Sequence, residues 1–96
     1  MSIVEITTFR LADGVADGSF LALDRRVQTE LVPNQPGFLR RTTARHGEDW
    51  LVVTLWSTED AAAAFQRAIE GDPLQAEFMQ AMEAGTFHLA RYATLD

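Results

Sequence analysis

Apolar and polar positions follow two different periods along this chain of 96 residues. Four segments are rich in β-branched and aromatic residues, as strands are: residues 3–11, 38–45, 50–56 and 86–95. Three further segments have helical spacing or helix-starting residues instead: residues 20–31, 61–70 and 73–84. The pattern therefore predicts the order β-α-β-β-α-β, with the second helical region in two pieces.

Turn and capping residues mark where these elements begin and end. Asp17 or Ser19 is predicted to cap the first helix, and Pro33 to end it. Residues 57–60 supply hydroxyl caps and first-turn acids for the second helix, and Asp72, which precedes a proline, is predicted to cap the third. The charged residues of the first helix are placed largely opposite its apolar side: Asp24, Arg25, Arg26 and Glu30.

The predicted order is that of the ferredoxin-like, or split βαβ, fold of the α+β class, with both helical layers on one face of a four-stranded antiparallel sheet. Residues 50–56 are apolar on both faces of their strand. Trp50, Val52 and Trp56 point one way, and three further apolar side chains point the other: Leu51, Val53 and Leu55. Because helices cover only one face, a second copy of the chain is expected to bury the other, which predicts a homodimer.

Composition excludes several classes of chemistry. The chain has no cysteine and no lysine, and only two histidines, so thiol, Schiff-base and three-histidine zinc chemistry are excluded and no metal site is expected. A net charge of −6 makes nucleic acid and anionic membranes poor partners. No apolar run is long enough to span a membrane, and residues 1–10 do not resemble a signal peptide, so a cytoplasmic location is expected.

Two motifs resemble a known family. Asn34-Gln35-Pro36-Gly37-Phe38 is similar to a turn of the antibiotic biosynthesis monooxygenase (ABM) family, and so is the run Trp50-Leu51-Val52-Val53-Thr54-Leu55-Trp56-Ser57, which acids, alanines and Phe65 follow. The resemblance covers nearly the whole chain, which indicates a single ABM-like domain over residues 1–96. It implies a dimeric α+β barrel, in which two ferredoxin-like sheets close against each other. Activities in the family include cofactor-independent oxidation of aromatic polyketides and haem degradation.

The haem-degrading branch of that family carries an asparagine, a tryptophan and a histidine at its haem site. On this chain the three positions fall on Thr7, Phe65 and Phe78. None of the three residue types is kept, so haem degradation is not expected.

Six residues are candidates for a site in an apolar cavity between sheet and helices. Glu5 or His88 could act as the base, with Thr7 and Tyr92 as hydrogen-bond partners and two aromatic walls: Phe65 and Phe78. Each also has a structural alternative. Glu5 could pair with an arginine, His88 could be a hydrogen-bonded structural residue, and the others could serve packing alone.

Two functions remain open at this point. One is a cofactor-free monooxygenase, which needs neither metal nor flavin and acts on a small aromatic or polyketide-type molecule. The other is a non-enzymatic binding or accessory module that uses the same cavity without turnover. Periodicity does not decide between them, nor does it tell which strand faces line the cavity.

Overall fold

Four antiparallel strands form one sheet in the computed structural model, which describes residues 1–95. The sheet order is β2-β3-β1-β4. The strands are bounded as follows: β1 Ile3–Phe9, β2 Phe38–His46, β3 Asp49–Trp56 and β4 His88–Ala93. The helical elements are α1 Asp17–Arg26, η1 Val27–Leu31, α2 Glu59–Ala68 and α3 Pro73–Gln80.

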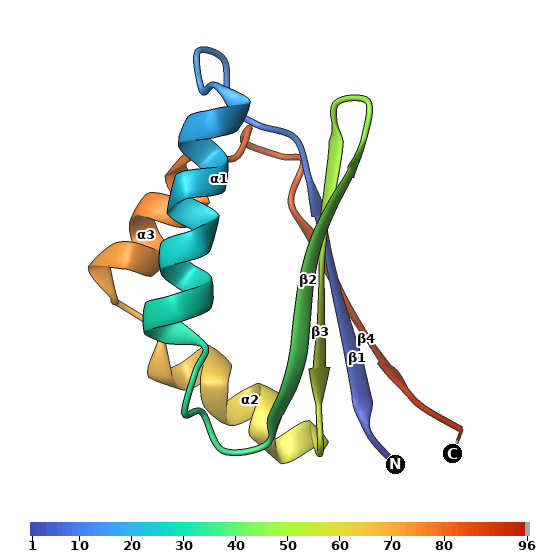
Figure 1. Cartoon of the computed structure of the whole chain (residues 1–96). Coiled ribbons are helices and arrows are strands. Elements are labelled where there is room, and N and C mark those ends of the chain that lie inside the picture. Colours follow the sequence, from blue (N-terminus) through green and yellow to red (C-terminus); the bar gives the residue numbers. More distant parts are fainter. Residues whose placement is uncertain (96) are drawn as a thin grey trace.

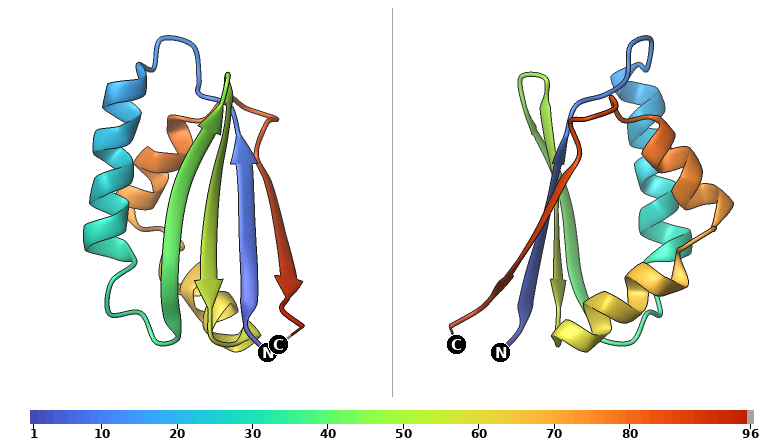
Figure 2. Two further views of the ribbon diagram at one scale, coloured as in Figure 1. Left: turned by 45° about the vertical axis from the view of Figure 1, so that its right-hand side comes forward. Right: turned by 180° about the vertical axis from the view of Figure 1, so that it is seen from behind.

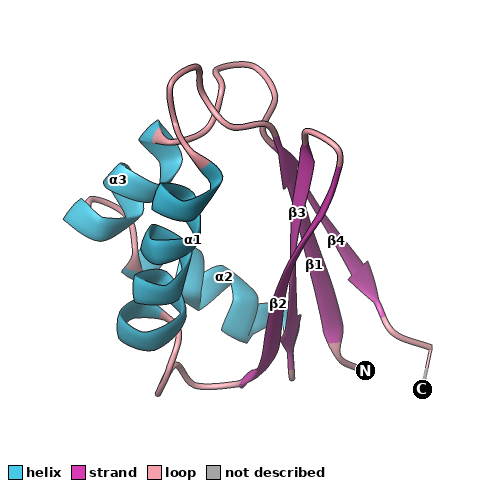
Figure 3. Cartoon of the chain, turned by 45° about the horizontal axis from the view of Figure 1, so that its top comes forward, coloured by secondary structure: helices cyan, strands magenta, loops and turns pink. Residues whose placement is uncertain are grey.

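All helices lie on one face of the sheet, as every ribbon view shows (Figures 1, 2 and 3). The structure therefore confirms the predicted ferredoxin-like order β-α-β-β-α-β. Among the helices of residues 1–95, none combines the length and the apolar character needed to cross a membrane.

The caps of the second helical region are as predicted, but those of the first are not. The Thr58 side chain accepts a hydrogen bond from the Ala61 backbone N–H, and Asp72 accepts from the two N–H groups at the start of α3. The prediction for the first helix is wrong, because its N-cap is Ala16, which makes no side-chain cap, and Asp17 is already helical. The last helix and strand are also shorter than residues 73–84 and 86–95.

The first helix ends in a π-helical turn. In η1 the Val32 N–H donates to the carbonyl of Val27 five residues earlier, at 3.2 Å. The wider turn brings Val27 and Val32 to the same side, where both are buried against the sheet. Such turns are rare and frequently lie at functional sites.

The inner face of the sheet carries the hydrophobic core. Trp50, Val52 and Trp56 point toward the helices and are at most 6% exposed, which settles which face of β3 is covered. Phe9, Phe20 and further aromatic rings pack there with centroids 5.0–6.4 Å apart, mostly in tilted or edge-to-face arrangements. The alternate residues of β3 lie on the outer face, half-buried: Leu51, Val53 and Leu55.

A bulge in β2 changes which of its side chains face inward. Phe38 pairs with Trp56, whereas Arg40 pairs with Leu55, so two steps along β2 match one step along β3. The bulge leaves Leu39 exposed and turns Arg41 toward the helices, whereas simple alternation from Phe38 would turn Arg40 inward.

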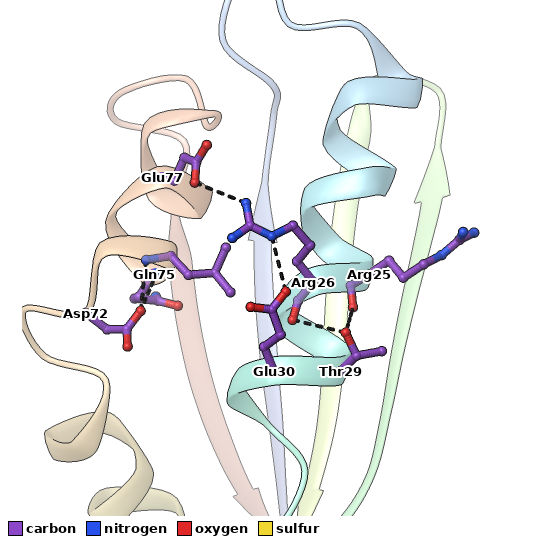
Figure 4. A network of polar contacts seen from close by, with 8 residues as sticks. Arg25, Arg26, Thr29, Glu30, Asp72, Gln75 and Glu77 are labelled. Carbon is purple, nitrogen blue, oxygen red and sulfur yellow. Dashed lines mark hydrogen bonds and ion pairs between the residues drawn. The ribbon is translucent and has the colours of Figure 1, made fainter.

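Polar contacts tie the helices to one another on their outer side. Arg26 pairs with Glu30 in the next turn at 3.2 Å and with Glu77 of α3 at 3.6 Å (Figure 4). All three side chains are more than half exposed, so the contribution of each pair to stability is small. The pairs nevertheless connect the first helix with α3 above the sheet.

Candidate functional site

A cavity of about 250 Å³ lies between the inner face of the sheet and the helices. Its polar lining comes mainly from the sheet and from the facing sides of α2 and α3: Glu5, Thr7, Arg41, Thr54, Gln66 and Gln75. Its apolar lining includes four side chains of the helical layer and two at the start of β4: Val27, Phe65, Ile69, Phe78, Phe87 and Leu89. Phe87 and Leu89 are more than a third exposed, so they form the rim of the cavity.

Four polar side chains cross the inner face of the sheet in one row, which we call the polar row: Arg41, Thr54, Glu5 and Arg91. Arg41 is opposite Thr54, Thr54 is opposite Glu5, and Glu5 is opposite Arg91. Directly opposite residues have Cβ atoms about 4.5–5.5 Å apart, so these side chains are neighbours. The row is unusual because the neighbouring inward positions of the central strands are largely apolar.

Glu5 forms an ion pair at one end of the polar row. Its Oε2 accepts a hydrogen bond from Arg91 Nε at 2.8 Å, and its side chain is 7% exposed. The arginine-paired alternative considered for Glu5 is therefore present. Among residues 1–95 the second carboxylate oxygen, Oε1, has no hydrogen-bond partner, and Glu5 lines the cavity.

Arg41 forms a second buried ion pair at the other end of the row. Its Nη2 donates to Asp24 Oδ1 at 2.8 Å, and its Nη1 donates to Gln28 Oε1 at 3.1 Å. The two charged side chains are 5% and 12% exposed. The Phe78 ring lies against the guanidinium, 5.8 Å from its carbon to the ring centroid. These contacts hold Arg41 in one position at the cavity wall.

The structure divides the six candidate residues between the two faces of the sheet. Glu5, Thr7, Phe65 and Phe78 meet around the cavity. His88 and Tyr92 lie on the outer face, opposite Thr8 and Val4 of β1, and both are exposed. They therefore have no access to the cavity of their own chain.

The polar residues at or beside the cavity that were not candidates from the sequence include Arg41, Asp24 and Thr54. Asp24 was expected on the solvent side, and that expectation is wrong because it is 9% exposed. The sequence did contain a signal for this burial, because Asp24 lies four residues after Phe20 and three before Val27, within the apolar stripe of the helix. For Arg41 no such signal existed, since the bulge that turns it inward is invisible in the alternation.

A second hollow at the far end of the sheet is less suited to a ligand. Its two arginines are exposed and already paired with acids, Arg10 with Glu48 and Arg45 with Asp17. No group of three or more His, Cys, Asp or Glu side chains in residues 1–95 is arranged to hold a metal ion.

Comparison with known proteins identifies the fold. No protein-family model matches the sequence, and no curated protein matches it. Among solved structures, SnoaB of Streptomyces nogalater, a cofactor-independent oxygenase, is similar with a TM-score of 0.82 and 16% identity, over 99% of this chain and 94% of SnoaB.

Two further solved structures are similar to this chain. A Bordetella bronchiseptica protein, provisionally named an antibiotic biosynthesis monooxygenase, has a TM-score of 0.80 and 15% identity over 98% of this chain and 97% of its own. A Caulobacter crescentus protein with the same provisional name has a TM-score of 0.72 and 20% identity, over 99% of this chain and 91% of its own. This chain therefore adopts the α+β fold of the antibiotic biosynthesis monooxygenases.

Proposed function

We propose that the cavity binds a small aromatic molecule and that the protein is a cofactor-independent monooxygenase. The observation that supports this most is the polar row, because it brings an acceptor, a hydroxyl and a donor together inside a cavity whose lining is largely apolar. Sites for small molecules typically combine an apolar lining with a few converging polar groups. The fold that this chain shares with SnoaB is consistent with such chemistry.

In the proposed reaction the substrate supplies its own electrons. Glu5 takes a proton from an activated phenol or enol, and the resulting carbanion adds to dioxygen to give a peroxide. Loss of water from the peroxide at a methylene carbon leaves a carbonyl, so one oxygen atom enters the product and the other leaves as water. The chain contributes a positioned base, hydrogen bonds and exclusion of water. Glu5 is preferred over His88 as the base, because only Glu5 lines the cavity.

One observation favours the alternative, a binding module without turnover. One oxygen of Glu5 is already hydrogen-bonded to Arg91, so the carboxylate also has a structural role. Both functions use the same cavity, and they differ in whether oxygen is consumed.

Haem degradation is not part of this proposal. Phe78, which lines the cavity, lies at the position where the family's haem-degrading branch carries its histidine, and a phenyl ring cannot ligate iron.

We further propose that a second copy of the chain covers the outer face of the sheet. Helices pack on the inner face alone, which leaves the apolar side chains of the central strands without a covering layer (Figure 2): Val4, Ile6, Leu51, Val53 and Leu55. In a homodimer both copies bury this same face at once. His88 and Tyr92 would then lie near the partner rather than in the cavity.

Oxygen uptake with small dihydroxyaromatic compounds tests the proposed activity. The wild-type protein should consume oxygen without added metal, flavin or reductant. Glu5→Gln should lower kcat by about 100-fold or more, since general-base catalysis contributes about 10²–10⁴-fold. The matched control Glu48→Gln changes an exposed glutamate far from the cavity and should leave kcat unchanged. Ligand binding without oxygen uptake would instead support the binding module.

A further inference from the structure

Two charged side chains line the cavity, Arg41 and Glu5, and each is already paired with an opposite charge of the chain. Arg41 lies 2.8 Å from Asp24, and Glu5 lies 2.8 Å from Arg91. An additional buried charge on a ligand would have no counter-ion in the cavity, and an uncompensated buried charge is costly. The cavity is therefore best suited to a neutral ligand.

Arg41 and Glu5, which flank Thr54 in the polar row, differ in hydrogen bonding. A carboxylate only accepts hydrogen bonds, whereas a guanidinium only donates them, through five N–H groups. Glu5 Oε1 has no partner among residues 1–95. Arg41 donates three hydrogen bonds, to Asp24, Gln28 and Thr43, so two of its N–H groups are unused within the described chain. The Thr54 hydroxyl between them can do both.

We propose that Arg41 is the residue that orients the ligand, by donating to a carbonyl oxygen while Glu5 accepts from a hydroxyl group. This inference rests on the proposed function and deepens it by naming a substrate class, the neutral aromatic hydroxyketones. The strands of Arg41 and Glu5 are separated only by β3. Two interstrand steps place their backbones about 10 Å apart, a separation that side chains and a ring with substituents at opposite ends can fill.

The same orientation assists the proposed chemistry. In a conjugated hydroxyketone, removal of the hydroxyl proton moves negative charge toward the carbonyl oxygen. That oxygen then lies beside the fixed guanidinium of Arg41, which the ion pair with Asp24 and the ring of Phe78 already hold in place. Donors that are preorganised where charge develops need no rearrangement during the reaction.

Binding of three related probes to the wild-type protein tests this inference directly. Calorimetry would compare 4-hydroxyacetophenone with 4-methoxyacetophenone, which lacks the donor, and with 4-ethylphenol, which lacks the carbonyl. Hydrogen bonds to charged groups contribute enough that each loss should weaken binding about tenfold or more. Equal affinity for the three probes, or no binding of any of them at millimolar concentration, would overturn the inference.

A pair of variants assigns the carbonyl contact to Arg41. The double variant Arg41→Met with Asp24→Leu removes the donor and both charges together, so no buried charge is left unpaired. It should bind 4-hydroxyacetophenone and 4-ethylphenol equally, and still discriminate against the methoxy probe. The control Arg45→Gln, an exposed arginine on the same strand, should keep both preferences. Retention of the carbonyl preference by a folded double variant would overturn the assignment, and if that variant does not fold, the wild-type series decides.

The outcomes also separate this inference from the proposed function. Probe preferences without oxygen uptake would remove the monooxygenase and leave the binding orientation standing. Oxygen uptake without probe preferences would support the monooxygenase and overturn the proposed binding orientation.

Discussion

At Gly37 the backbone has a φ of +82°, a conformation that side-chain-bearing residues rarely adopt. A Cβ atom there would lie 2.5 Å from Ala61 Cβ and 2.8 Å from Ser57 Oγ. The turn before β2 therefore packs directly on the start of α2, and the glycine lets the two approach. The motif that suggested the family thus has a physical cause in packing.

We expect Gly37→Ala to lower the free energy of unfolding by about 2–5 kcal/mol, the sum of a left-handed backbone cost and of overpacking. Urea denaturation at one fixed protein concentration measures the loss. Gly14→Ala is the matched control, because Gly14 has a φ of +84° but open space around it. It should lose only the backbone part, about 1–2 kcal/mol. Equal losses at the two positions would contradict the packing explanation.

Single residues also show why the candidate site was only partly predictable. Glu5 and Thr7 could be placed at the cavity, because they alternate with Ile3 and Phe9 on a strand whose inner face is largely apolar. Asp24 lies on the apolar stripe of its helix, but its charge suggested solvent, because its counter-ion lies 17 residues away in sequence and is brought near only by the fold. Pairing between distant charges is a tertiary property that a local pattern does not contain.

Among the helices, α3 depends on its cap more than α1 does. The Asp72 carboxylate accepts from the N–H groups of Leu74 and Gln75 at 2.8 and 3.3 Å, next to a proline in the first turn. In α1 the corresponding position is Ala16, which offers no acceptor. The sequence contained suitable capping residues at both helices, but only one set lies at the actual start.

Asp72→Ala should reduce the free energy of unfolding by about 1 kcal/mol, within the range of about 0.5–2 kcal/mol for loss of an N-cap. Thermal unfolding followed by circular dichroism would show the loss. Ser19→Ala tests the rejected cap of α1 and should change stability by less than about 0.5 kcal/mol, as is usual for exposed positions. A larger loss at Ser19 than at Asp72 would mean that the helix starts are misplaced.

Strand order and direction were predictable, but the facing of individual side chains was less so. Alternation correctly grouped Trp50, Val52 and Trp56, yet β3 is apolar on both faces, so the helix-covered face could not be chosen. That ambiguity carried over to His88 and Tyr92, which the structure places on the outer face. The bulge in β2 likewise made the facing of Arg41 unpredictable, because one extra residue reverses the alternation of inward and outward side chains.

At the scale of the whole molecule, the sheet is covered on one face and bare on the other. Light scattering should therefore give about twice the chain mass of 10.7 kDa. Val53→Asp places a carboxylate on the outer face and should yield a folded monomer, because burying an unpaired charge at the interface costs several kcal/mol.

Val52→Asp is the matched comparison on the inner face. Val52 is 6% exposed, so the same carboxylate there should unfold the chain rather than only separate the copies. Circular dichroism distinguishes the two results. A wild-type monomer at micromolar concentration, or a Val53→Asp dimer, would rule out the outer face as the interface.

The position of β1 in the middle of the sheet has a consequence for synthesis of the chain. β1 is synthesised well before both of its neighbours, β3 and β4, and Ile3 pairs with Ala93. During translation both edges of β1 therefore stay unpaired while the α1 helix and the β2–β3 hairpin form from local contacts. Sheets with such distant pairings fold slowly and expose strand edges meanwhile. Nascent chains of this protein should thus depend on chaperones until residues 88–93 have left the ribosome.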